Sequence, residues 1–217
     1  MTLTQAVLSF AVVAGLLTLV PGIDTALVLR SSITRTRGYA FATALGISTG
    51  AMVWGVAAAV GVSALLAASE LAYRALTLAG AAYMVWLGVS LLWKSRAKAG
   101  TAAATAAGPT LPAAANGQLL RGWATGTGTN LLNPKVGVFY IATIPQFIPT
   151  GVSPLLVGVV LAGVHCLLTM AWFTLLIFGS QFASKWLKGP RSIKVVDRIT
   201  GTVLVAFGLK LAATPGH

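Results

Sequence analysis

The sequence predicts an all-α integral membrane protein with six transmembrane helices, arranged as two inverted three-helix repeats whose first and fourth helices are broken. Three observations lead to this prediction. Only 8% of the 217 residues are Asp, Glu, Lys or Arg, whereas a soluble domain has about 25%. Long apolar segments alternate with short basic ones. A proline also interrupts one apolar segment at a corresponding place in each half of the chain.

Each predicted span is an apolar segment long enough to cross a bilayer, which takes roughly 20 residues. In the first half, Asp24 is the one charge within the first span, and Glu70 and Arg74 are expected in a short loop between the second and third spans. In the second half, Pro134 interrupts the fourth span. The predicted spans cover residues 3–29, 38–69, 75–93, 122–147, 155–182 and 195–213.

Basic residues predict the orientation and support the number of spans. Twelve of the 15 Lys and Arg residues follow the first, third and fifth spans. Because an excess of Lys and Arg marks cytoplasmic loops, both termini are expected outside. Five spans would place basic clusters on both faces, which favours six. The net charge of +12 lies mainly in these clusters, without interleaved aromatic residues, so no nucleic-acid partner is predicted.

The chain is expected to divide into two halves joined by a linker. Residues 99–117 are mainly Ala, Thr, Gly and Pro, which is typical of a flexible loop. Shifting the chain by 113 positions aligns Pro21 with Pro134, and Gly88 matches Gly208 at a slightly different offset. With three spans in each half, the second half must insert upside down. The predicted first repeat, cytoplasmic linker and second repeat are residues 1–93, 94–118 and 119–217.

The two proline breaks predict a polar site within the membrane. Proline removes a backbone donor and clashes with the preceding helical turn. Backbone groups freed in this way must line protein or a wet cavity at membrane depth. Inverted repeats with paired broken helices are the architecture of many secondary transporters. Two breaks that face each other would therefore form a polar site among apolar helices.

Short motifs occur in order along nearly the whole chain. They are Pro21-Gly22-Ile23-Asp24-Thr25, followed by residues 46–50, 80–88, 133–135 and 145–147. Together they resemble the LysE/RhtB family of lysine, threonine and homoserine exporters. Ile23 stands where the family usually has a second proline. The resemblance implies an amino-acid exporter in the bacterial cytoplasmic membrane, and we expect no cofactor.

Asp24 is the strongest candidate for a functional residue. An ionisable group within an apolar span is costly unless it is paired, and such groups mark functional sites. We expect Asp24 to bind a substrate ammonium group or to exchange a proton for it. The alternative is an interfacial acid that is neutralised by Arg30 or that caps the second half-helix. Lys135 is its counterpart: it would pair with Asp24 in the empty protein, attract a substrate carboxylate, or extend to the membrane surface.

Groups beside the two breaks complete the predicted substrate site. Asn130 and Asn133 would coordinate a zwitterion or satisfy backbone groups exposed at Pro134. Free N–H groups at the starts of the second half-helices are donors for a carboxylate. His165 is a candidate for proton coupling with Asp24, or a hydrogen-bonded link between helices. The predicted substrate-binding residues are Pro21, Gly22, Asp24, Thr25, Asn130, Asn133, Pro134 and Lys135.

Two glycine pairs predict close helix packing. Gly46 and Gly50 are four residues apart, as are Gly122 and Gly126. Small residues at this spacing let membrane helices approach each other closely. Surfaces that slide during transport are the alternative interpretation.

The leading hypothesis is a secondary exporter of an amino acid or similar small zwitterion, driven by proton antiport. No phosphate-binding loop is present, so ATP is not the expected energy source. A channel, or a transporter of another small solute, is the alternative. An integral membrane enzyme is disfavoured, because the chain has one cysteine and no metal-ligand set. The expected partners are the substrate, protons and the lipid bilayer, and a homo-oligomer is compatible with the sequence.

Overall fold

The computed structural model describes residues 1–96, 117–180 and 190–213, and all of the regular elements within them are helices. The predicted all-α class is therefore confirmed for the described part of the chain. The elements are α1 (Leu3–Leu19), α2 (Ile23–Thr34), α3 (Arg37–Ala68), α4 (Glu70–Arg96), α5 (Gln118–Leu131), α6 (Pro134–Thr143), the short 3-10 helix η2 (Ile144–Phe147), α7 (Pro154–Phe178) and α9 (Pro190–Ala213).

Three described helices are long and apolar enough to cross a membrane: Arg37–Leu65 of α3, Glu70–Trp93 of α4 and Pro154–Phe178 of α7. A fourth span is formed if α1 and α2 are counted together, since they pass the same test as a pair bent by 56°. By length and composition, the described residues thus provide three or four spans. This agrees with a membrane protein, although it falls short of the six spans predicted from the sequence.

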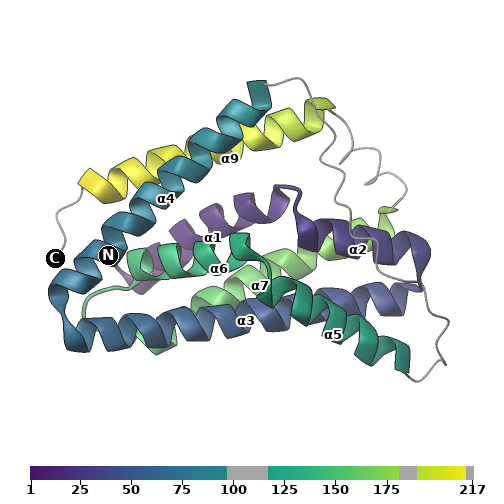
Figure 1. Ribbon diagram of the computed structural model, residues 1–217, viewed down its shortest axis with the longest axis horizontal. Coiled ribbons are helices and arrows are strands. Elements are labelled where there is room, and N and C mark those ends of the chain that lie inside the picture. Colours follow the sequence, from purple (N-terminus) through teal and green to yellow (C-terminus); the bar gives the residue numbers. More distant parts are fainter. Residues whose placement is uncertain (97–116, 181–189, 214–217) are drawn as a thin grey trace.

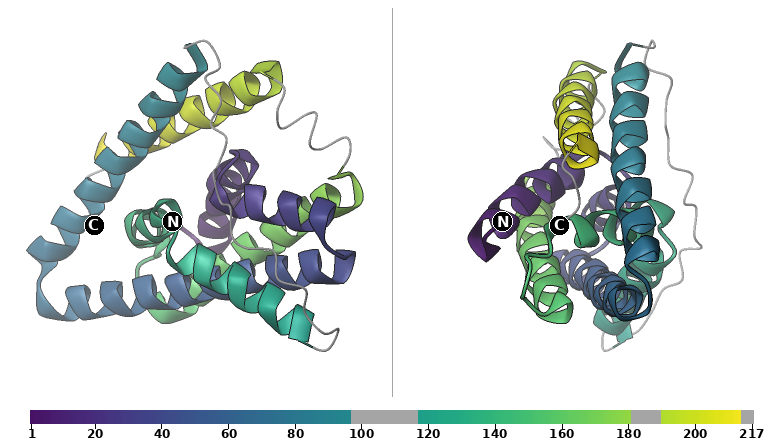
Figure 2. Two further views of the ribbon diagram at one scale, coloured as in Figure 1. Left: turned by 45° about the vertical axis from the view of Figure 1, so that its right-hand side comes forward. Right: turned by 90° about the vertical axis from the view of Figure 1, so that its left-hand side faces the viewer.

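The helices form a bundle with one pair set apart from the rest. In Figure 1, α4 and α9 lie side by side across one side of the bundle, and α3 runs along the opposite side. In Figure 1, α1 and α6 lie between them, whereas α5 crosses α3 on the side away from α4 and α9, and Figure 2 shows the α4–α9 pair from two further directions. The start of α1 and the end of α9 lie at the same end of the bundle (Figure 1).

The loop expected at Glu70 and Arg74 is wrong, because both residues lie in α4. Ser69 separates α3 from α4, and its hydroxyl accepts a hydrogen bond from the Ala72 N–H at 3.2 Å. Arg74 forms an ion pair with Glu70 at 2.8 Å, one helical turn apart. A negative side chain is also favourable in the first turn of a helix. These charges therefore extend the helix rather than end it.

The predicted close packing at the two glycine pairs is confirmed, and it joins α3 to α5. A Cβ atom built on Gly46 would lie 2.0 Å from the carbonyl oxygen of Trp123, and one on Gly126 would lie 2.1 Å from that of Thr43. Neither distance is sterically allowed, so these helices approach as closely as they do because no side chain intervenes. The hydroxyl of Thr127 donates to the Gly46 carbonyl at 3.0 Å. Together these contacts join the two halves of the chain.

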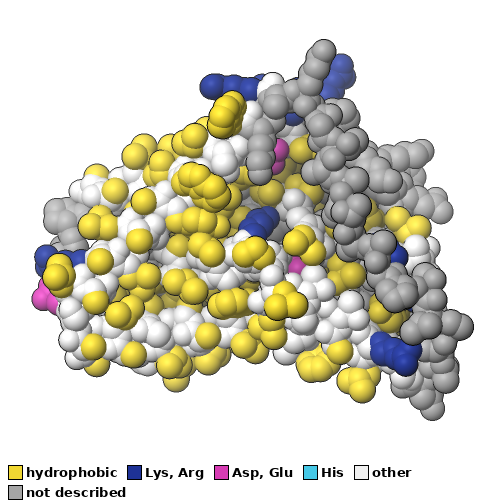
Figure 3. Space-filling model, in the orientation of Figure 1, with side chains coloured by type: hydrophobic (Ala, Val, Ile, Leu, Met, Phe, Trp, Pro, Cys, Tyr) yellow, Lys and Arg dark blue, Asp and Glu magenta, His cyan; other side chains and the backbone are white. Residues whose placement is uncertain are grey.

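The outer surface is strongly apolar. Large hydrophobic side chains are well exposed on several helices, among them Trp93 of α4, Leu120 of α5 and Leu167 of α7. One face is covered mostly by hydrophobic side chains, while Lys and Arg lie mainly toward its edges (Figure 3). Soluble monomers rarely expose contiguous apolar surfaces of this extent. Lipid is the solvent that such a surface requires.

Several predicted boundaries differ from those in the structure. The helix at the predicted fourth span begins earlier than expected, at Gln118, and the helix at the predicted sixth span begins at Pro190 instead of residue 195. The predicted linker over residues 94–118 lies mostly outside the described residues, as do the last two residues of the predicted fifth span. α4 extends into the predicted linker as far as Arg96.

Candidate functional site at the two helix breaks

The first break separates α1 from α2 at Val20, Pro21 and Gly22. Proline disfavours helical geometry in the residue before it, and Val20 is extended, with φ −67° and ψ 117°. Gly22 is also extended and precedes α2 without a side-chain cap. The C-terminal end of α1 and the N-terminal end of α2 therefore meet inside the bundle, with backbone carbonyl and N–H groups available for other partners.

The second break separates α5 from α6 in a different way. Pro134 is the first residue of α6, where its missing N–H costs nothing. Asn133 caps the helix, because its Oδ1 accepts a hydrogen bond from the Lys135 N–H at 3.1 Å. Both predicted breaks are thus confirmed, and only the second has a side-chain cap.

Polar side chains join the two breaks. Asn130, in the last turn of α5, donates from Nδ2 to Oδ2 of Asp24 in the first turn of α2, at 2.8 Å. Asn133 and Lys135 also lie close enough to interact with the Asp24 carboxyl group. The other oxygens, Oδ1 of Asp24 and Oδ1 of Asn130, are buried and have no hydrogen-bond partner among the described residues.

Lys135 reaches back across the site to the first break. Its Nζ lies 3.4 Å from the carbonyl oxygens of both Leu17 and Val20, at the C-terminal end of α1. A Cβ atom on Gly22 would be 3.6 Å from the same nitrogen. A positive charge is favourable at this end of a helix, where unpaired carbonyls carry the negative end of the helix dipole.

These residues line one cavity of about 50 Å³. By the usual measure of 10–15 Å³ for each water molecule, it has room for about three to five. Its apolar lining comes from Leu17, Val20, Ile47, Ala51, Val136 and Phe173. Its polar lining comes from Thr18, Asp24, Thr25, Asn130, Asn133, Lys135, His165 and Thr169. Charged and amide groups of both breaks thus face a small space that is otherwise apolar.

His165 also lines this cavity and connects three helices. Its Nδ1 pairs with the hydroxyl of Tyr140 at 2.9 Å, and its Nε2 pairs with that of Thr18 at 3.1 Å. The Thr18 hydroxyl also lies 3.5 Å from that of Thr169. His165 is therefore a hydrogen-bonded link between α1, α6 and α7, and it faces the same space as Asp24.

The structure brings together most of the residues predicted for the site. Gly22 and Thr25 line the cavity alongside the charged and amide residues. Pro21 and Pro134 do not line it; both are exposed, and they act by ending the helices. Thr18 and Thr169 also line the cavity, and neither is among the residues predicted from the sequence. Thr169 could have been found from its spacing, because it follows His165 by one helical turn and so shares its face of α7.

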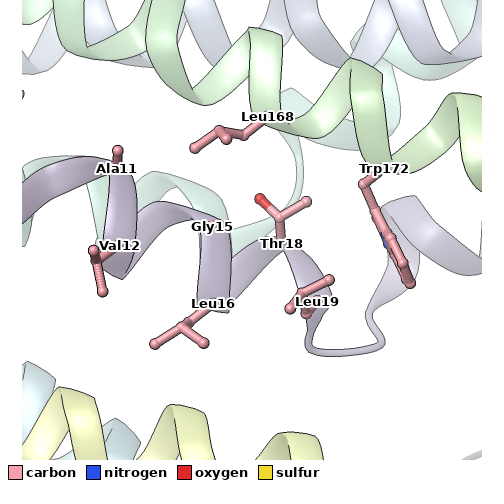
Figure 4. A pocket seen from close by; sticks show the side chains of 8 residues that line it. All are labelled: Ala11, Val12, Gly15, Leu16, Thr18, Leu19, Leu168 and Trp172. Atoms are coloured by element: carbon pink, nitrogen blue, oxygen red, sulfur yellow. The ribbon is translucent and has the colours of Figure 1, made fainter. Parts of the chain in front are cut away.

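A second, apolar groove of about 390 Å³ lies between α1 and α7. Figure 4 shows Leu168 and Trp172 extending from α7, with Ala11 and Thr18 on the side of α1 that faces Leu168 and with Val12 and Leu16 pointing away from α7. Helix packing is loose here, since a Cβ atom on Gly15 would meet only Leu168, at 3.8 Å. Thr18 lines both this groove and the polar cavity, so the two spaces adjoin at this side chain.

The family assignment follows from comparison with known proteins. A family profile described as LysE type translocator matches residues 2–214, which is nearly the whole chain. The chain belongs to the LysE family. This agrees with the resemblance found in the sequence motifs, and it makes the chain a multi-pass membrane protein of a translocator family.

Several curated relatives of this LysE-family chain are similar over almost their entire length. A membrane protein of Bacillus subtilis, YrhP, is 30% identical, with 95% of this chain and 98% of the relative covered. The homoserine/homoserine lactone efflux protein of Salmonella typhimurium is also 30% identical, with 94% and 95% covered. The leucine efflux protein of Enterobacter sp. is 28% identical, with 94% of each chain covered. No solved structure matches the chain.

Proposed function

We propose that this protein is a secondary exporter that moves an amino acid or a similar small zwitterion out across the bacterial cytoplasmic membrane by proton antiport. The observation that carries the proposal is the hydrogen bond between Asp24 and Asn130, which joins two broken helices at a cavity in an apolar bundle. A carboxylate in such a place is costly to maintain, and carboxylates retained within membranes serve solute or proton pathways.

The relatives support the substrate class. Those with efflux names are described as acting on homoserine and its lactone, leucine, or threonine. These compounds differ in their side chains and share a primary amino group, which is protonated near neutral pH. A carboxylate is the natural partner of an ammonium group. Asp24 is therefore proposed to hold the substrate ammonium and, in the return step, to carry the exchanged proton.

The rest of the cavity suits the rest of a zwitterion. Lys135 provides a positive charge for the substrate carboxylate, and the uncapped start of α2 provides backbone N–H groups. Apolar walls, including Ile47 and Phe173, would surround a substrate side chain. A space for about three to five water molecules is smaller than an amino acid. Binding therefore requires the half-helices to move apart, as expected when access alternates between the two membrane faces.

We propose that His165 positions α7 and is not the coupling group itself. Both of its ring nitrogens are engaged by hydroxyl groups, and it is buried. A membrane histidine in this setting ties helices together by interhelical hydrogen bonds. Asp24 is then the group whose protonation couples transport to the pH gradient.

We further propose the six-span arrangement, with residues 1–93 and 119–217 as inverted repeats and both termini outside. The packing of α4 against α9 favours this arrangement. Gly88 and Gly208, which the sequence comparison matched, both lie where these helices touch: a Cβ atom would be 2.6 Å from the Gly201 carbonyl and 2.8 Å from the Ala81 carbonyl, respectively. Labelling of single cysteines at Thr2 and Thr36 with a membrane-impermeant reagent tests the orientation, since only Thr2→Cys should react from outside.

Transport in proteoliposomes tests the function itself. Purified protein is reconstituted with labelled homoserine, threonine or leucine inside, and efflux is followed with and without a pH gradient. The proposal predicts that at least one of these amino acids leaves the proteoliposomes faster with the pH gradient than without it. Unlabelled substrate on the opposite side should also accelerate exchange, which a channel would not show. Folded protein that gives no gradient-dependent flux for these amino acids would contradict the proposal.

A further inference from the structure

The ammonium group of Lys135 occupies a cation-binding position that belongs to the other broken helix. Its Nζ lies 3.4 Å from the Leu17 and Val20 carbonyl oxygens, at the negative end of α1. In broken membrane helices, freed carbonyls of this kind commonly coordinate cations. Here the cation comes from the protein itself, on a flexible side chain anchored in α6.

The same cavity has an acceptor that this side chain leaves unused. Oδ1 of Asp24 is buried without a hydrogen-bond partner among the described residues. It can only accept while Asp24 is ionised, and it joins the two α1 carbonyls as an acceptor at this site. A primary ammonium group has three donors and no acceptor, so it matches a cavity that offers several acceptors at once.

We propose that Lys135 is a tethered competitor for the ammonium subsite formed by Asp24 and the Leu17 and Val20 carbonyls. In the empty protein its ammonium fills part of this subsite. The α-ammonium of an arriving amino acid displaces it, and the released Lys135 then binds the substrate carboxylate. The inference rests on the proposed function, because it assumes that the substrate binds in this cavity.

The competition predicts opposite effects of Lys135 on two kinds of ligand. When an amino acid binds, Lys135 loses its contacts in the empty protein. Its new contact with the substrate carboxylate offsets this loss. For a primary amine that lacks a carboxylate, Lys135 only competes. Removal of the Lys135 charge should therefore weaken amino-acid binding and strengthen amine binding. A merely structural role of Lys135 would change both affinities in the same direction.

The test uses threonine with its decarboxylated analogue 1-amino-2-propanol, and leucine with 3-methylbutylamine. Binding to the purified full-length protein is measured by calorimetry or ligand-induced thermal shift. In Lys135→Met, we expect the affinity for the bound amino acid to fall about tenfold or more, as for loss of a charge-assisted hydrogen bond, and that for its amine to rise. Lys210→Met, a change at the far end of α9, should alter neither.

Two safeguards keep the test decisive. If Lys135→Met does not fold, Lys135→Gln has a similar length and no charge, and the parent protein alone can be tested with N-acetyl derivatives. These keep the carboxylate and lose the ammonium, so their affinity should be lower by about tenfold or more. Intact amino-acid binding with no rise in amine affinity would overturn the competition. Failure of the parent to bind any of these amino acids would instead contradict the proposed function.

Discussion

Asn130 in α5 donates a 2.8 Å hydrogen bond to Asp24 in α2, which lies 106 positions away in the chain. Each residue lies beside a proline break, Asp24 just after the first and Asn130 just before the second. The bond therefore does more than satisfy one carboxylate oxygen. It joins the two halves of the chain at the point where both helices are interrupted.

Replacement of Asn130 by Ala removes this donor and leaves the Asp24 carboxylate less well satisfied. A hydrogen bond to a charged group contributes about 1.5–3 kcal/mol, so we expect a lower melting temperature and loss of transport. Thr125→Ala is the matched control on the same helix, because the Thr125 side chain is exposed and bonds only to its own helix. Equal melting temperatures for the two variants would contradict the proposed importance of the Asn130 bond.

Glycine at the α3–α5 crossing should be irreplaceable at one position and dispensable two residues away. Gly126→Ala would place a Cβ atom 2.1 Å from the Thr43 carbonyl, whereas a Cβ atom on Gly128 has no heavy atom within 4 Å. We expect Gly126→Ala to reduce the yield of folded protein and its melting temperature. Gly128→Ala should be neutral or stabilising by up to about 1 kcal/mol, because alanine is the better helix former. Similar behaviour of both variants would show that the close packing is not needed.

Asn133 combines a structural role with a proposed substrate contact, and two substitutions separate them. Serine also caps helices well, so Asn133→Ser should keep the stability of α6, while Asn133→Ala should cost about 1 kcal/mol. If the amide itself contacts substrate, both variants should show a raised KM in the efflux assay. A normal KM in Asn133→Ser would limit Asn133 to capping α6.

His165 provides a test of which group couples transport to protons. His165→Asn and Tyr140→Phe should both lower the melting temperature, because each breaks the 2.9 Å hydrogen bond between these residues. Interhelical hydrogen bonds in membranes average about 0.6 kcal/mol, so the decrease should be modest. Efflux in both variants should keep its dependence on the pH gradient. Loss of that dependence in His165→Asn alone would place His165 in the proton pathway.

The features that could be predicted from the sequence depend on local chemistry. A proline within an apolar span removes a helical hydrogen bond, so the breaks at Pro21 and Pro134 are predictable from the sequence. Asp24 was identified because a charge in an apolar segment is conspicuous. The spacing of Gly46 and Gly126 with their small partners predicted the helix crossing, although it did not show which helices would meet.

The features that could not be predicted depend on tertiary contacts or on backbone atoms. The acceptors of Lys135 are carbonyls of Leu17 and Val20. Every residue has a backbone carbonyl, so the residue types do not show which one binds a side chain. Tyr140 contacts His165 from a different helix. Glu70 and Arg74 were expected in a loop because they are charged, but an ion pair one turn apart is compatible with a helix that extends beyond the lipid.

Efflux by Asp24→Asn, measured beside the parent protein and Glu70→Gln, tests the central claim most directly. Glu70 is the matched control, since it is an acid at the exposed start of α4, outside the site. In proteoliposomes with labelled substrate and an imposed pH gradient, we predict that Glu70→Gln transports like the parent and that Asp24→Asn loses gradient-driven efflux. Undiminished, pH-dependent efflux by folded Asp24→Asn would contradict the assignment of transport to the two helix breaks.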